Sequence, residues 1–255
     1  MVHGHWFYVR TATLVQYFFY KNLAAFTAQL IYACFNSFST QAVYDVINST
    51  MFNILFTSIP VLVYGLFEQN LPDTELMKKP EYYKANARNR LLAVDKSLLW
   101  IAEGLFHSIL CFFAFYLLWK DNIGHPRNTL DMLSFGIAVY STIIVIVNLR
   151  LLIHAKFWNV VLVSAVVLSI LSYFGFTFAI HAMPSGYKVS FIIHEMYKVI
   201  YHTLCLGGSG GIWLTSLLVI FVAMLPYLII EPLHQQFSSF KDRKMEYHNQ
   251  AFSYS

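Results

Sequence analysis

Residues 11–35 of the chain read TATLVQYFFYKNLAAFTAQLIYACF, and Lys21 is the only charged residue among them. About 20 apolar residues in a helix cross the hydrocarbon core of a bilayer, so this stretch is long enough to span a membrane. A lysine well inside such a span costs on the order of 3 kcal/mol. We therefore expect Lys21 either to reach an interface or to face a polar pathway.

The helical face that carries Lys21 is small and polar. Residues three, four, seven and eight positions later lie on the same side of a helix. These positions hold Ala24, Ala25, Ala28 and Gln29, and the adjacent Asn22 adds a second amide. The pattern predicts a groove of small residues that begins at Lys21 and ends at an amide.

The composition of the whole chain indicates a membrane protein. Hydrophobic residues make up 58 % of the 255 residues and charged residues only 12 %, whereas soluble domains have about 25 % charged residues. The mean hydropathy is +0.55. With several apolar runs of spanning length, we predict an all-α integral membrane protein with six transmembrane helices. The predicted spans are 11–35, 47–67, 98–118, 132–153, 157–180 and 211–230.

Lysines and arginines predict the orientation of these spans. Six spans place both termini on one side, and twelve of the sixteen basic residues other than Lys21 fall on that side. Basic loops stay in the cytosol, so both termini are predicted to be cytosolic. The net charge of +4 then belongs to loops that face anionic lipid, and it indicates no nucleic-acid partner.

The second predicted span contributes further polar residues. Asn53 and Thr57 are four residues apart and share a helical face, and Pro60 removes one backbone hydrogen bond and predicts a kink. Together with the first span they predict a polar lane, which we define as Lys21, Asn22, Gln29, Asn53 and Thr57. Two interpretations are open: the lane is a substrate pathway, or its polar groups lock the packing of the two helices.

The sequence lacks the common motifs for metal binding, thiol chemistry, serine hydrolysis and nucleotide binding. The ten histidines include no His-Glu-x-x-His, and there is no Cys-x-x-Cys, Gly-x-Ser-x-Gly or Walker sequence. We therefore predict no metal site, no catalytic residue and no cofactor within this chain. Glu103 and His107 are four apart in the third span, a spacing that allows a structural pair within one helix.

Five ordered segments carry a resemblance to a known family. They are HGHWFYVR (3–10), QYFFYKN (16–22), FSTQAVYD (38–45), FNILFTSIP (52–60) and KPEYYK (79–84). The chain resembles the C-terminal membrane region of type-IV P-type ATPases, the phospholipid flippases. The sequences of these segments are most similar to those of the animal subgroup that flips aminophospholipids. The sequence similarity covers about the first 120 residues, and the hydropathy pattern of the family continues to the end of the chain.

The resemblance implies a fold and a function. The six spans would be membrane helices five to ten of the family, preceded by the end of a cytosolic stalk (residues 1–10) and followed by a cytosolic tail (231–255). The family's membrane lysine and asparagines would fall on Lys21, Asn22 and Asn53. The full-length family uses ATP and Mg to move phosphatidylserine or phosphatidylethanolamine from the exoplasmic to the cytosolic leaflet, in the plasma membrane, endosomes or Golgi. It also implies a two-span glycosylated accessory subunit as a partner.

The chain also departs from that family. The Asp-Lys-Thr-Gly phosphorylation sequence is absent, as are the nucleotide-binding and actuator domains and the first four membrane helices. Ile47 and Val61 replace a tryptophan and a proline that are frequent in the family. We therefore expect the transport half of a lipid translocase that is inactive alone. The alternative is a non-catalytic six-span scaffold or decoy that binds the accessory subunit.

Overall fold

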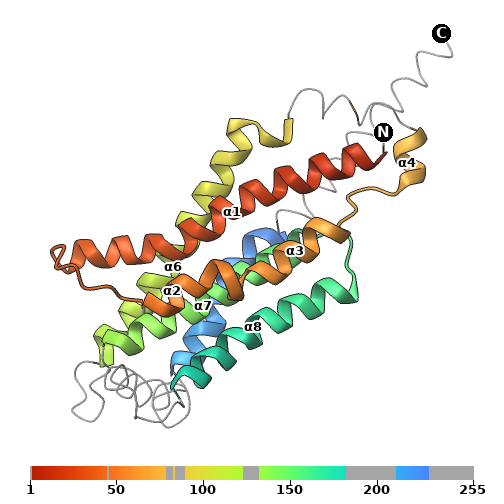
Figure 1. Ribbon diagram of the computed structural model, residues 1–255. Helices are drawn as coiled ribbons and strands as arrows, with labels where there is room; N and C mark the ends of the chain where they lie inside the picture. Colours follow the sequence, from red (N-terminus) through yellow and green to blue (C-terminus); the bar gives the residue numbers. More distant parts are fainter. Residues whose placement is uncertain are drawn as a thin grey trace.

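A computed structural model describes residues 2–44, 46–78, 83, 90–122, 132–181 and 211–229, and in these residues every regular element is helical (Figure 1). The predicted tail, residues 231–255, lies outside them. The first elements are α1 (Val2–Phe35), α2 (Val46–Met51), the π-helical segment η1 (Phe52–Phe56), α3 (Ser58–Phe67) and the short α4 (Asp73–Lys78). They are followed by the 3₁₀ turn η2 (Arg90–Leu92), α6 (Val94–Asn122), α7 (Met132–His154), α8 (Val160–His181) and a helix at Gly211–Ile229.

Five helical segments in the described part of the chain are long and apolar enough to cross a membrane, so the predicted number of six is wrong by this measure. They are Val46–Phe67, Val94–Leu118, Phe135–His154, Val160–Thr177 and Gly211–Ile229. The helix left out is α1, the stretch that was expected to span first. Its lysine, its amides and its tyrosines lower its hydropathy, although it is the longest helix described, at 34 residues.

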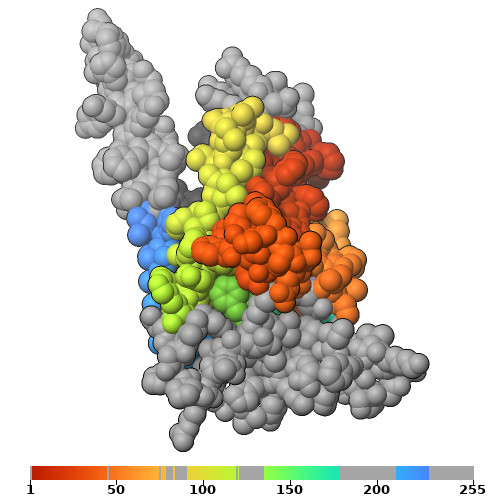
Figure 2. Space-filling view, turned by 90° about the vertical axis from the view of Figure 1, so that its left-hand side faces the viewer, coloured from red at the N-terminus to blue at the C-terminus, as the bar shows by residue number. Residues whose placement is uncertain are grey.

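The helices run up and down between two ends of the molecule. The segment α2–η1–α3 lies between α1 and α8, and α1 packs chiefly against α6 (Figure 1). The connection from α1 to α2 lies at one end. Figure 2 looks onto that end, where this connection, in orange-red, lies beside α6, in yellow-green. The start of α1, the end of α3 and the α7–α8 turn lie at the opposite end.

Helix α7 is the centre of the bundle. Inside the molecule 72 % of its span is buried, against 28–39 % for the other four spans. It packs against α1, α3, α6 and α8. A helix that is apolar on all sides is expected in such a central place. The outer helices instead turn large apolar side chains outward, as membrane helices in contact with lipid do, for example Leu62, Leu117 and Leu171.

Two glycines allow close helix contacts. A Cβ atom added to Gly104 of α6 would lie 2.8 Å from the carbonyl oxygen of Tyr20 and 3.3 Å from the Cβ of Leu23, so α1 and α6 approach each other closely there. A Cβ added to Gly136 of α7 would collide with the carbonyl oxygen of Val43 in the α1–α2 connection. Small residues are typical of such crossings in membranes, because they let backbones approach.

Side chains of α1 fasten its first half to the segment that follows α3. The indole Nε1 of Trp6 donates to the carbonyl of Leu71 (2.9 Å), and the Gln16 amide donates to the carbonyl of Leu91 (2.7 Å). Arg10 donates to the carbonyl oxygen of Glu68 (2.5 Å). The helix is therefore held along its first four turns before it enters the bundle.

Candidate functional site

The second span is broken in the middle of the bundle. Its π-helical segment η1 ends at Phe56, Thr57 has a non-helical backbone (φ −136°, ψ −3°), and α3 begins at Ser58. Pro60 is the third residue of α3 and has no N–H, so it cannot donate to the carbonyl oxygen of Phe56, four residues earlier. The break therefore lies one turn before the proline. Turns of this kind are frequent at functional sites.

Lys21 of α1 faces this break. Its side chain is only 3 % exposed, and Nζ donates to the Thr57 hydroxyl at 2.9 Å. That hydroxyl in turn donates to the carbonyl oxygen of Phe52 at 2.7 Å, inside the wide turn. The ammonium also lies 5.2 Å and 5.9 Å from the ring centres of Phe18 and Phe52. No carboxylate pairs with Lys21 in the described part of the chain.

The two asparagines of the lane meet beside Lys21. The amide nitrogen of Asn53 donates to the amide oxygen of Asn22 at 3.0 Å, and the amide nitrogen of Asn22 donates to the carbonyl of Phe18 at 2.9 Å. This chain of hydrogen bonds leaves the Asn53 oxygen, Oδ1, buried with no donor among the residues that the structure describes. Lys21, Asn22, Asn53 and Thr57 thus form one group, which we call the Lys21 cluster.

The remaining lane residue, Gln29, lies apart. It is half-buried two turns beyond Lys21 and makes no hydrogen bond to the Lys21 cluster within the described residues. The intervening Ala24, Ala25 and Ala28 are fully buried in the core. The small-residue groove expected from the sequence is therefore filled by packing, and the polar surface is confined to the break in the second span.

The Phe56 carbonyl, which Pro60 leaves without its helical donor, accepts hydrogen bonds from side chains of two other helices. Asn148 of α7 donates from Nδ2 to the Phe56 oxygen at 3.2 Å, and the hydroxyl of Ser169 in α8 also donates to it. Neither residue was placed at a site by the sequence. Two sequence features could have pointed to this contact: the position of Phe56, four residues before Pro60, and the isolated polar residues in two apolar spans. The sequence does not say which of those polar residues faces Phe56.

A second buried polar group lies on α6 and α7. Arg150 binds the Glu103 carboxylate at 2.5 Å, and its guanidinium lies between the rings of Trp100 and Tyr227, 4.5 Å and 4.0 Å from their centres. The expected Glu103–His107 pair does not form, because Glu103 turns across to α7. His107 instead contacts the Tyr20 hydroxyl at 2.7 Å. Arg150, which was counted among the cytosolic loop cations, is buried inside the bundle.

Glu68 connects helices at the end of the bundle where α1 begins. One carboxylate oxygen accepts hydrogen bonds from the backbone N–H groups of Lys156 (2.9 Å) and Phe157 (3.3 Å), and the other is buried without a partner. Burial raises the pKa of Glu68 above its ordinary value, and the two N–H groups and Arg10 oppose that rise. The residue therefore joins the end of α3 to the α7–α8 turn and, through its backbone, to α1.

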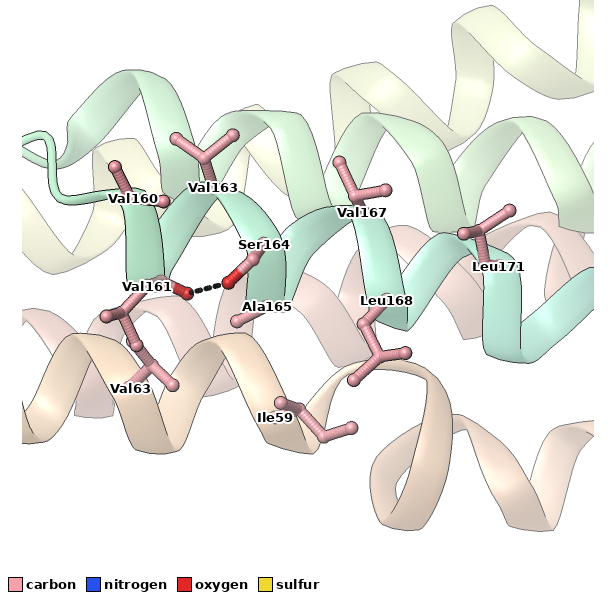
Figure 3. A pocket seen from close by; sticks show the side chains of 10 residues that line it. All are labelled: Ile59, Val63, Val160, Val161, Val163, Ser164, Ala165, Val167, Leu168 and Leu171. Atoms are coloured by element: carbon pink, nitrogen blue, oxygen red, sulfur yellow. Dashed lines mark hydrogen bonds between the residues drawn. The ribbon is translucent and has the colours of Figure 1, made fainter.

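The described surface also has a shallow groove between α3 and α8, which is distinct from the Lys21 cluster (Figure 3). Valine and leucine side chains of α8 and two residues of α3, Ile59 and Val63, line it. Its one hydroxyl, on Ser164, donates to the carbonyl of Val161 in its own helix at 2.9 Å. The groove therefore offers acyl-chain contact but no polar recognition.

The described residues offer no group of side chains suited to binding a metal ion. No group of three or more His, Cys, Asp or Glu residues that could hold a metal ion occurs among the described residues. The Lys21 cluster combines a buried cation, amides and a hydroxyl, and the Thr57 hydroxyl accepts from Lys21 while it donates to the Phe52 carbonyl. Such a group of donors and acceptors inside an apolar bundle is suited to binding a polar group.

Comparison with known proteins agrees with this membrane architecture. The family model described as "Phospholipid-translocating P-type ATPase C-terminal" matches residues 1–239. The chain is 30 % identical to Phospholipid-transporting ATPase IH of Mus musculus over 92 % of its length, and 33 % identical to Phospholipid-transporting ATPase 11C of Mus musculus over 90 %. It is 27 % identical to Phospholipid-transporting ATPase IC of Homo sapiens over 97 %. It spans about a fifth of the length of these relatives, 20 % in each case.

Proposed function

Since this chain belongs to the phospholipid-translocating P-type ATPases, as part of their C-terminal membrane region, we propose that it forms the transport half of an ATP-driven flippase for aminophospholipids. In this proposal the lipid moves from the exoplasmic to the cytosolic leaflet, and the Lys21 cluster binds its headgroup on the way. Gln29, two turns farther along α1 toward the α1–α2 connection, would contact the lipid in this proposal only after the helices around it separate.

The observation that supports this most directly is the unused hydrogen-bonding capacity of the Lys21 cluster. Lys21 has three N–H donors and uses one on Thr57, while Asn53 Oδ1 is a buried acceptor without a donor. A buried polar group left without a partner costs about 1–3 kcal/mol, more when it is charged. Such a cost is retained where a ligand supplies the missing partner.

A headgroup with a phosphate and a primary ammonium supplies both missing partners. Its phosphate accepts hydrogen bonds from the Lys21 ammonium, and the primary ammonium of serine or ethanolamine donates to Asn53 Oδ1. The trimethylammonium of choline has no N–H and cannot make the second bond. The cluster therefore favours phosphatidylserine and phosphatidylethanolamine over phosphatidylcholine.

ATP and Mg belong to the part of the transporter outside this chain. In this proposal every role of the residues of this chain concerns the lipid. The residues of this chain bind and orient the headgroup. Hydrolysis of ATP would supply the free energy for its movement.

The orientation and partners of the chain complete the proposal. Glu68 and Leu91 of the basic 68–97 segment lie beside the first half of α1, since they accept hydrogen bonds from Arg10 and Gln16. We infer that the end of the bundle where α1 begins is cytosolic in a plasma-membrane, endosomal or Golgi bilayer, and that a two-span accessory subunit covers the exoplasmic end. A cysteine at Asn70 should then resist impermeant thiol reagents in intact cells, and labelling there would reverse the orientation.

Headgroup binding can be measured on the 255-residue chain in phosphatidylcholine nanodiscs. Short-chain phosphatidylserine or phosphatidylethanolamine should bind and displace each other, whereas added short-chain phosphatidylcholine should not compete. Replacing Asn53 by leucine removes the ammonium acceptor and should lower the preference for phosphatidylserine at least fivefold. Ile54→Ala, on the exposed side of the same turn, is the matched control and should keep that preference.

The possible outcomes separate the parts of the proposal. Equal binding of all three headgroups would reject the aminophospholipid substrate but keep the lipid pathway. If no headgroup binds and the accessory subunit still associates, the non-catalytic scaffold becomes the better account.

A further inference from the structure

The backbone break in the second span needs support that its own helix cannot supply. Pro60 removes the N–H that would bind the Phe56 carbonyl in an unbroken helix. The hydrocarbon region has no water to replace that donor, and an unsatisfied carbonyl there is costly. Phe56 itself is fully buried, so a donor must come from a neighbouring helix.

Two fully buried side chains supply it. Asn148 of α7 donates to the Phe56 oxygen at 3.2 Å and to the Ile144 carbonyl at 2.9 Å. Ser169 of α8 donates to the same Phe56 oxygen, and its hydroxyl lies 3.3 Å from the Asn148 amide oxygen. We call Asn148 and Ser169 the Phe56 clamp. It joins three helices at one backbone atom.

We propose that the Phe56 clamp is a positioning device for headgroup recognition: Asn148 and Ser169 hold the wide turn in the register in which Asn53 contacts Asn22 while Thr57 contacts Lys21. This inference rests on the function proposed for the Lys21 cluster. Neither clamp residue touches Lys21, and both act through the backbone between Phe56 and Thr57.

The geometry of helices explains why the register matters. A π-helical turn holds one residue more than an α-helical turn. Closing it into an α-helix would rotate the residues on one side by about 100° relative to those on the other, since each residue of an α-helix turns the chain by that amount. Asn53 and Thr57 would still be four residues apart, but Thr57 would lose its bond to the Phe52 carbonyl, five residues earlier. Its hydroxyl would also turn relative to Asn53, so the Asn53–Asn22 and Thr57–Lys21 contacts could not both be kept. The clamp stabilises the open turn because only there does the Phe56 carbonyl meet both donors.

A double-mutant cycle between α8 and the proline tests the inference in the 255-residue chain. Ser169→Ala should lower the thermal unfolding midpoint in detergent by about 2–4 °C and weaken binding of short-chain phosphatidylserine at least threefold. Ser169→Thr keeps the hydroxyl and should restore both. In a Pro60→Ala background the new amide can donate to the Phe56 carbonyl, so Ser169→Ala should leave the midpoint unchanged.

Ser164→Ala is the matched control, because Ser164 lies on the same helix and bonds only within it (Figure 3). It should change neither the midpoint nor the lipid affinity. Equal losses of stability from Ser169→Ala with and without Pro60 would overturn the clamp. A loss of stability with unchanged phosphatidylserine affinity would overturn its positioning role. If the unmutated chain binds no headgroup, the proposed function fails, and the midpoints alone decide whether the clamp holds the turn.

Discussion

Replacing Lys21 by methionine separates ligand binding from helix packing, because the two roles predict different changes in stability. Methionine keeps a flexible unbranched side chain and removes the charge. Within the protein the change removes one hydrogen bond, the 2.9 Å contact of Nζ with the Thr57 hydroxyl. It also removes two weak contacts of the ammonium with aromatic rings, at 5.2 Å and 5.9 Å from their centres.

The magnitude follows from two opposing terms. A hydrogen bond from a charged donor contributes about 1.5–3 kcal/mol. An ammonium within a membrane span costs about 2.5–3.5 kcal/mol, and Lys21 is 3 % exposed with no carboxylate beside it in the described residues. The terms cancel to within about 1 kcal/mol, which corresponds to about 2–4 °C in the unfolding midpoint for a chain of this size. We expect Lys21→Met to unfold within that range of the unchanged chain.

Lipid affinity should respond much more strongly. The variant loses the only cation in the described residues that lies beside the Asn22–Asn53 pair, so phosphatidylserine should bind at least tenfold more weakly, a change of about 1.4 kcal/mol. Lys21→Arg should also weaken binding, because a planar guanidinium differs from an ammonium in shape and hydration. Thermal unfolding and titration with short-chain phosphatidylserine, both on the purified chain, measure the two quantities.

Gln16→Met is the matched control, since Gln16 lies on the same helix but donates to the carbonyl of Leu91 outside the Lys21 cluster. It should lose about 1 kcal/mol of stability and no lipid affinity. The reasoning is refuted if Lys21→Met unfolds more than about 5 °C lower while phosphatidylserine binds as before. The polar groups of α1 and η1 would then serve to lock the helices together.

Three further predictions concern the frame around the Lys21 cluster. Glu103→Gln should lower stability by about 3–5 kcal/mol, because it leaves the Arg150 charge buried alone, and adding Arg150→Met should recover most of that loss in thermal unfolding. Gly104→Ala should cost about 1–3 kcal/mol through a collision with the backbone of α1, whereas Gly175→Ala, with open space around it, should cost little by the same measurement. Because the folded pKa of Glu68 is raised, its proton is held more tightly in the folded state, so stability should fall as pH rises from about 4.5; Glu68→Gln should remove that slope, and an unchanged slope would assign it to another group.

The helical bundle could be predicted from the sequence because lipid solvation acts on whole segments. Long apolar runs exceed what a soluble core needs, and the predicted ends of the second to sixth spans lie within a few residues of the structural ones. The first span falls short of the hydropathy of the other five for the same reason. Its helical length was expected, but the average over its residues includes Lys21 and several amides, which only neighbouring helices can shield.

Contacts between helices could be predicted only in part. Asn53 and Thr57 follow from spacing and from Pro60, because a proline acts on its own helix. The partners of Phe56 and of Arg150 depend on which faces of α6, α7 and α8 meet, and local spacing carries no such information. Glu103 shows this directly: a residue four positions away was available, yet the carboxylate binds Arg150 on another helix, where the charges are opposite.

The close approach of Gly104 to Tyr20 makes this contact a pivot beside Lys21 for any tilt of α1. Val2 lies 19 residues before Lys21, about 28 Å along the axis of α1. A tilt of 10° about this contact would carry the start of α1 through roughly 5 Å while moving the backbone of Lys21 by a few tenths of an ångström, since the lever arms are so unequal. Spin labels at the exposed Phe7 and Ile54 could follow the two ends of such a lever. Large swings of the first residues of α1 would therefore move the backbone of Lys21 very little, and axial rotation of α1 or movement of the broken span would separate Nζ from the Thr57 hydroxyl more directly.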